Sequence, residues 1–400
     1  MKDTDKTIWI YKNFNMGQEL DISGEFIYDG IAALNEMKCI FEGSPLFSFL
    51  YHTSVGIERL QKIIIVLFEN INSDEYEKFE KSLITHSHQD LHARIKKNAK
   101  INFNSRENDL LTLLTRFYKG ARYNRFNVVN SGCKEEELLV EFVEKYLKPS
   151  EIEHHFISSK IVVNESVKDL IGKTIGNISS KYYALLRAGA NKNGTFTYEL
   201  VSDSKAEKIF LNNYRKNSLQ DMKITESIAV KELVTCIRNA DETCAFFRFL
   251  DTVEPLGFDV NLINEYLSEL ARGNIPQSLV DEVETLYEEK GYSKDRVEMV
   301  DLIGNTRVDF ELGEISDIIK LIDSFMTSEI SEETFVKDFV NKATVIEDEE
   351  FNEISKKSVS LCRKFLEGKI SSLNLKKSIE EHLMAIKSSY EFLECNCVET

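Results

Sequence analysis

Hydrophobic residues recur every three or four positions over most of the first 130 residues, which is the period of an amphipathic α-helix. Glycine, proline or polar capping residues separate one such pattern from the next. The pattern predicts four helices, which begin near Phe26, Leu46, His88 and, as an N-cap, Ser105. The second helix is apolar on more than one side and is therefore expected at the centre. Short connections indicate an antiparallel helical bundle over about residues 26–130.

Helical patterns continue beyond the bundle, at about residues 135–147, 166–188 and 226–250. Two short segments depart from this pattern. Thr7–Tyr11 is strand-like but too short for a sheet, and the turn signal Asn193-Gly194 beside the alternating stretch Thr195–Leu200 favours a small β-hairpin. No internal repeat is visible. The predicted fold class is mainly α: a helical bundle, a further helical region and at most one hairpin.

Charge is distributed unevenly along this acidic chain, whose formal net charge is -17. Residues 281–350 hold 21 Asp or Glu against 7 Lys or Arg, whereas residues 81–126 hold 10 Lys or Arg against 3 Asp or Glu. The composition changes at Pro255-Leu-Gly257, which also indicates a break. We therefore expect two domains, namely a bundle domain over 1–255, with a helical extension over 150–255, and an acidic helical domain over 256–400.

The composition predicts a cytoplasmic protein without a membrane span. The longest strongly apolar run, Ile63–Phe68, is far shorter than the roughly 20 residues that a membrane helix needs. The first residues lack the apolar core of a secretory signal. The seven cysteines have no repeated spacing, and Cys395 and Cys397 do not match the common zinc spacing. We expect reduced thiols, no metal and no cofactor.

The end of the fourth predicted helix, "FYKGARYNRF", combines cations with aromatic rings. Tyr118, Arg122 and Arg125 fall on one stripe of this helix, at the edge of its buried face. Arginine can hold a phosphate through two hydrogen bonds and tyrosine can stack on a base, so the pattern favours a nucleotide or RNA. Alternatively, these arginines pair with the acidic C-terminal region. The whole cationic face comprises Lys96, Lys97, Lys100, Arg106, Arg116, Lys119, Arg122 and Arg125.

Three histidines in "SLITHSHQDLHARI" are candidates for proton transfer, because histidine titrates near neutrality. His88 and His92 are four residues apart and are expected on one helix face. This is also a spacing of zinc ligands, but Gln89 stands where the zinc-protease motif needs a glutamate, so metal catalysis is not expected. His86 or His88 could instead cap the helix and hydrogen-bond to the arginine-rich helix.

Glu58 and Arg59 lie within the largely apolar second helix, where an unpaired charge would be costly. One interpretation is a buried ion pair that joins two helices. The other is that Glu58 orients Arg122 or a histidine.

"THSHQDL" at 85–91 and "LLTLLTRFYKGARYNRF" at 110–126 resemble the HEPN family of helical domains. The resemblance implies a small helical bundle that is often dimeric, and it implies ribonuclease activity, nucleotide binding or partner binding in bacterial defence systems. Nuclease members carry a histidine a few residues after an arginine. Here no histidine follows Arg116, Arg122 or Arg125 until His154, so the base would come from the neighbouring helix.

Three hypotheses follow. The protein is a HEPN-like RNA-binding protein or metal-independent ribonuclease of antiphage or toxin-type defence, a catalytically inactive module that dimerises or binds an operon partner, or a small-nucleotide sensor. The first predicts a homodimer or larger homo-oligomer that binds RNA or nucleotide. Its expected catalytic residues are Arg122, His88, His92 and Glu58. Its expected ligand-binding residues are Tyr118, Arg116, Tyr123, Arg125 and Arg59.

Overall fold

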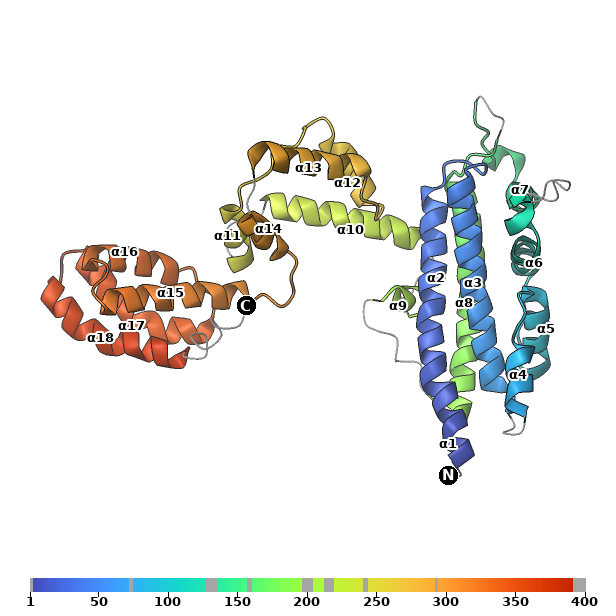
Figure 1. Ribbon diagram of the computed structural model, residues 1–400, viewed down its shortest axis with the longest axis horizontal. Coiled ribbons are helices and arrows are strands. Elements are labelled where there is room, and N and C mark those ends of the chain that lie inside the picture. The colour runs from blue at the N-terminus through green and yellow to red at the C-terminus, as the bar shows by residue number, and fades with distance from the viewer. Residues whose placement is uncertain are drawn as a thin grey trace. The chain divides into compact units, whose positions relative to one another are not determined.

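The computed structural model divides the chain into two compact units, Met1–Ala229 and Val230–Thr400 (Figure 1). The division falls inside one helix, α10, whereas the sequence placed a domain boundary at residue 255. The residues that the structure describes are 3–71, 75–126, 135–156, 160–195, 204–211, 219–239, 244–291 and 294–390.

Most of the described residues are helical, which confirms the mainly α fold class. Extended pairing among them is confined to two isolated bridges, Cys39 with Val162 and His154 with Ile161. The strand-like segment Thr7–Tyr11 is helical, so that expectation was wrong. Residues 196–200 of the expected hairpin lie outside the described residues.

Three long helices of the N-terminal unit, α2, α3 and α8, run side by side, and α4 to α7 lie along the α3 side (Figure 1). The predicted helices are confirmed at α3, α5 and α6. The first is confirmed at α2, but α2 begins at Met16 and not near Phe26. The elements of this unit are α1 (Asp3–Ile10), the π-helix η1 (Tyr11–Asn15), α2 (Met16–Glu36), α3 (Gly43–Phe68), α4 (Tyr76–Ser82), α5 (His88–Asn98), α6 (Ser105–Lys119), the 3-10 helices η3 (Ala121–Phe126) and η4 (Pro149–Glu151), α7 (Glu135–Tyr146), α8 (Glu165–Asn193), α9 (Lys205–Phe210) and the start of α10 (Leu219–Asn239).

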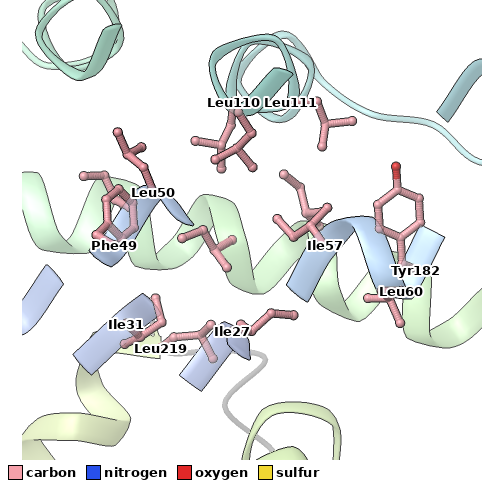
Figure 2. Packing of buried hydrophobic residues seen from close by; sticks show 14 of the residues in the cluster. Ile27, Ile31, Phe49, Leu50, Ile57, Leu60, Leu110, Leu111, Tyr182 and Leu219 are labelled. Carbon is pink, nitrogen blue, oxygen red and sulfur yellow. The ribbon is translucent and has the colours of Figure 1, made fainter. Parts of the chain in front are cut away.

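The core of this unit is built around α3, as the sequence predicted. Figure 2 shows α3 side chains such as Phe49 and Ile57 between residues of α2, α6 and α8, and all of them are buried. Glycines let α2 and α3 approach closely. A Cβ at Gly56 would lie 2.7 Å from Cγ1 of Ile27, and a Cβ at Gly30 would lie 2.5 Å from Oγ1 of Thr53. Neither position has room for a side chain.

The π-helix η1 places one buried lysine at the ends of two long helices. Lys12 Nζ donates to the backbone oxygens of Leu67, at 3.5 Å, and Glu69, at 3.2 Å, and to Oδ1 of Asn193 at 3.0 Å. Burial lowers the pKa of Lys12. One ammonium group therefore hydrogen-bonds at the C-terminal ends of both α3 and α8, where helix carbonyls lack intrahelical partners.

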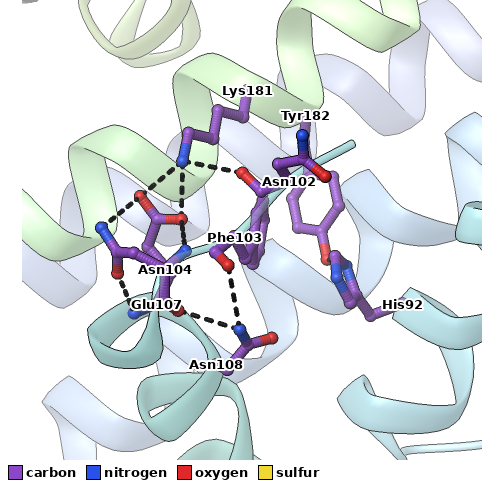
Figure 3. Close-up of polar contacts among 8 residues, drawn as sticks. All are labelled: His92, Asn102, Phe103, Asn104, Glu107, Asn108, Lys181 and Tyr182. Carbon is purple, nitrogen blue, oxygen red and sulfur yellow. Dashed lines mark hydrogen bonds and ion pairs between the residues drawn. The ribbon is translucent and has the colours of Figure 1, made fainter. Parts of the chain in front are cut away.

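The N-terminus of α6 is held by a polar cluster (Figure 3). Its N-cap is Asn104, one residue before the expected Ser105, and Asn104 forms a reciprocal capping box with Glu107. The Glu107 carboxylate is buried and lies 2.7 Å from Nζ of Lys181 on α8. A buried charge thus caps α6 and ties it to α8.

The C-terminal unit has its own core, formed by α15 to α18. Arg248 of α11 forms two hydrogen bonds, of 2.7 and 2.6 Å, with the carboxylate of Glu314 on α15. The helices of this unit are α11 (Ala245–Thr252), α12 (Ile263–Leu270), α13 (Gln277–Lys290), α14 (Lys294–Asp301), α15 (Phe310–Met326), α16 (Glu332–Ala343), α17 (Glu349–Leu366) and α18 (Ser372–Ser389).

The hairpins α15–α16 and α17–α18 form an internal repeat with a step of 40 residues, which the sequence analysis missed. Ser328 and Gly368 occupy equivalent loop positions, with φ of 66° and 69°. Ser331 and Ser371 are the N-caps that follow. Seven pairs of buried residues also correspond, namely Ile315 and Ser355, Ile318 and Ser358, Ile322 and Cys362, Phe335 and Leu375, Phe339 and Ile379, Ala343 and Leu383, and Ile346 and Ile386.

Candidate functional site

Arg122 lies in η3, directly after α6, between two tyrosine rings. Its guanidinium carbon is 3.9 Å from the ring centroid of Tyr118 and 4.5 Å from that of Tyr123. Its Nε is buried without a hydrogen-bond partner, and no carboxylate among the described residues pairs with it. Stacking on two rings holds the guanidinium in place while leaving its charge uncompensated, which suits an anionic ligand.

A buried carboxylate orients an exposed histidine that, like Arg122, contacts the ring of Tyr118. Nδ1 of His86, just before α5, is 3.0 Å from Oε2 of Glu58 on α3. Lys62 Nζ is 2.7 Å from the other oxygen of Glu58. The side chain of Glu58 is 10% exposed and that of His86 is 47% exposed. The carboxylate is therefore paired, as a buried charge must be, and it directs the histidine toward solvent.

The ring of Tyr118 on α6 joins these two parts of the site. The ring centroids of His86 and Tyr118 are 4.6 Å apart, and Tyr51 of α3 stacks on Tyr118 at 6.2 Å. Side chains from α3, α6, η3 and the segment before α5 thus meet around the Tyr118 ring. Of the residues predicted for the site, the structure brings together Glu58, Tyr118, Arg122 and Tyr123.

His88 and His92 lie in the core instead. Nδ1 of His88 is 3.0 Å from Oε1 of Gln61, and Nδ1 of His92 is 2.7 Å from the Tyr182 hydroxyl. Figure 3 shows His92 beside Tyr182 and Phe103. Burial lowers the pKa of each histidine to about 4. Of the three candidate histidines, the geometry therefore favours His86 for contact with a ligand, rather than His88 or His92.

The remaining predicted residues are placed differently. Nη1 of Arg116 is 2.7 Å from Oε2 of Glu141 on α7, and Arg59 forms an ion pair with Glu19 on α2. Both arginines thus form ion pairs within the N-terminal unit. Arg125 lies in η3, but its side chain is outside the described part of the chain.

The arrangement combines three chemical functions. The uncompensated guanidinium of Arg122 can bind phosphate oxygens, and His86, held by a carboxylate, can transfer a proton. Tyr123, which is 58% exposed, offers a ring face to a base. In the described ranges, no three His, Cys, Asp or Glu side chains converge as metal ligands would.

Comparison of the chain with protein-family models, with curated proteins and with solved structures gave no match. Among the helices that the structure describes, none combines the length and apolar character required to cross a bilayer.

Proposed function

We propose that the N-terminal unit binds RNA and cleaves it without a metal ion. The observation that carries the proposal is the unpaired Arg122 guanidinium, which shares the Tyr118 ring with the His86–Glu58 pair. Cleavage at a ribose needs a base for the 2′-hydroxyl proton and a cation for the phosphate. Both groups contact the ring of Tyr118.

The groups have distinct roles in this proposal. With Nδ1–H of His86 donating to Glu58, Nε2 accepts the proton of the 2′-hydroxyl. The 2′-oxygen attacks the adjacent phosphorus, the bond to the 5′-oxygen breaks, and that oxygen leaves with a proton from solvent. The products are a 2′,3′-cyclic phosphate and a 5′-hydroxyl. Arg122 stabilises the charge that develops on the non-bridging oxygens.

The exposed Tyr123 ring supports RNA over an isolated phosphate as the ligand. It lies against the guanidinium, so a base stacked on it would bring its own phosphate close to Arg122. The resemblance of residues 85–91 and 110–126 to HEPN domains supports the same assignment, and with it a role as an effector of bacterial defence.

Cleavage of labelled single-stranded RNA by the purified protein in a chelating buffer tests this proposal. We expect Arg122→Gln to lower the rate about 100-fold or more, as removal of one charge-stabilising group does. His86→Gln should lower it by about 100-fold or more, through loss of the base. Arg187→Gln, an exposed arginine on α8, is the matched control and should cleave at the wild-type rate.

The other outcomes separate the alternatives. RNA binding that depends on Arg122 without cleavage would identify a binding module and would contradict the catalytic part. Binding of a mononucleotide but not of RNA would indicate a nucleotide sensor. Cleavage that depends on His88 but not on His86 would contradict the assigned geometry.

A further inference from the structure

The C-terminal unit carries a cationic groove along one face of α17. The groove has a volume of about 610 Å³. Lys356, Arg363 and Lys364 line it and are exposed, and Lys356 and Lys364 pair with no carboxylate among the described residues. Lys369 also lines the groove, and its Nζ lies 2.5 Å from Oε2 of Glu367. After Lys369, the charge of Arg363 also helps to lower the pKa of Glu367. Glu367 is the one acidic residue that lines the groove. The other lining residues are Ala343, Thr344, Asn352, Ser355, Val359 and Ser360.

This groove reverses the charge of its surroundings. Residues 281–350 hold 21 Asp or Glu against 7 Lys or Arg, but residues 351–390 hold 8 Lys or Arg against 4 Asp or Glu. A cationic surface of this kind attracts a polyanion that the rest of the acidic chain repels.

The internal repeat shows that the fold does not require these cations. The first hairpin carries Ser316, Asp323, Ser324 and Glu329 where the second carries Lys356, Arg363, Lys364 and Lys369. Basic residues often stabilise the C-terminal end of a helix. The last turn of α15 has none, however, so the equivalent turn of α17 does not need Arg363 and Lys364 for that purpose.

The arrangement of the groove indicates the chemistry of its ligand. Lys356 and Arg363 are two turns apart, about 10 Å along the helix axis, so a linear array of charges fits them better than one compact anion. The Ser360 hydroxyl adds a hydrogen-bond donor for ligand oxygens. The Thr344 hydroxyl and Nδ2 of Asn352 already donate to the backbone oxygens of Val340 and Ile346. No aromatic side chain lines the groove, so it offers no ring on which a base could stack.

We propose that this groove binds a linear chain of phosphate groups, without reading bases. Two sources share this chemistry, the backbone of a nucleic acid and inorganic polyphosphate. The site is separate from the one assigned to the N-terminal unit and does not depend on that assignment.

Fluorescence anisotropy with a short labelled oligothymidylate, as a function of salt, tests the proposal on the full chain. The Arg122→Gln background silences the N-terminal site, and DNA lacks the 2′-hydroxyl needed for cleavage. Adding Lys356→Gln, Arg363→Gln and Lys364→Gln should weaken binding about tenfold or more and make the salt slope shallower by about 2.

The control carries Lys320→Gln, Lys337→Gln and Lys377→Gln, three exposed lysines of the same unit outside the groove. It has the same net charge and should bind like the background protein. The proposal would be overturned if both triple variants lost the same affinity for oligothymidylate, or if the background protein did not bind it. Binding of polyglutamate as tight as that of oligothymidylate would also overturn it. If the oligothymidylate binds, inorganic polyphosphate is added at equal phosphate concentration. Displacement of the oligothymidylate identifies polyphosphate as the ligand, and continued binding of the oligothymidylate identifies the nucleic-acid backbone.

Discussion

His86 and His88 are separated by one residue, yet their side chains have opposite environments. Ser87 between them is the N-cap of α5. His88 begins the helix on its buried face, together with Leu91, His92 and Ile95, whereas His86 precedes the cap and reaches Glu58. The spacing of His88 and His92 correctly predicted a shared face. It could not show that this face is the buried one, because histidine is found both inside and outside proteins.

The buried His88 predicts a pH dependence of stability. Its pKa is about 4 in the folded protein against an ordinary value of 6.5, so the unfolded chain binds the proton more readily between these values. The contribution of His88 to stability should thus be constant above pH 6.5 and decrease as the pH falls toward 4. At pH 5 the loss should be about 2 kcal/mol.

Urea denaturation of wild type and His88→Gln at pH 7.5 and pH 5 measures this effect. The free energy of unfolding should change less between the two pH values in the variant than in the wild type. The carboxylates that also titrate are common to both proteins, so they do not account for this difference. An identical pH dependence in the two proteins would show that His88 is not held neutral by burial.

Glu58→Gln separates positioning from binding at the proposed ribonuclease site. The amide retains the shape of Glu58 but loses the charge that orients His86, so we expect kcat to fall about tenfold or more while KM changes little. Arg122→Gln should instead also weaken RNA binding. Steady-state kinetics measure both, and a change in KM alone for Glu58→Gln would exclude a role through His86.

At the scale of elements, strongly periodic segments were predictable and weakly apolar ones were not. α3, α5 and α6 lie within a few residues of their predicted positions. α4 was missed because it is short and none of its residues is buried. The repeat was hidden because Ser355, Ser358 and Cys362 occupy core positions that isoleucines fill in the first hairpin, so the hydrophobic pattern does not recur.

Close helix packing predicts opposite effects for two Gly→Ala changes in the N-terminal unit. A Cβ at Gly24 of α2 would overlap the backbone of Ala206 on α9, so Gly24→Ala should destabilise by about 1–3 kcal/mol. At Gly176 of α8 the nearest atom would be Leu219 Cγ at 3.5 Å, an ordinary contact. Gly176→Ala should stabilise by about 0.5–1 kcal/mol. Thermal denaturation of both variants checks the contrast.

The repeat predicts that exchanging the residue types at its two equivalent loop positions, Ser328 and Gly368, changes stability in opposite directions. Ser328 adopts a left-handed conformation that costs a non-glycine residue about 1 kcal/mol, and Gly368 adopts the same conformation without that cost. Ser328→Gly should therefore stabilise the C-terminal unit by about 1 kcal/mol, and Gly368→Ser should destabilise it by a similar amount. Denaturant midpoints measure both changes in stability. If the two substitutions changed stability in the same direction, the equivalence of the two loops would be contradicted.

At the scale of the whole molecule, charge is distributed unevenly along the chain, and each of the two units has its own hydrophobic core. The sequence showed the cationic stretch in the N-terminal unit, but not that Glu58 and Arg122 would meet around one tyrosine ring. That meeting depends on how α3 packs against α5 and α6. The core of the C-terminal unit uses only residues between Ile315 and Tyr390.

This separate core predicts that residues 309–390 fold alone. The fragment keeps all seven buried pairs of the repeat and loses the contacts of α11 with α15. We expect a helical fragment that unfolds cooperatively in urea. Gradual loss of ellipticity without a transition would show that the hairpins need the rest of the chain.

The π-helix near the N-terminus fixes the rotational register of the helix before it. Trp9 Nε1 donates to the oxygen of Gly194 at 3.2 Å, and Lys12 reaches Asn193. Removing one residue from 13–15 would turn everything before it by about 100° about the axis. Both side chains would then point away from α8. A single deletion there would therefore break the contacts of Trp9 and Lys12 with α8 without removing either side chain.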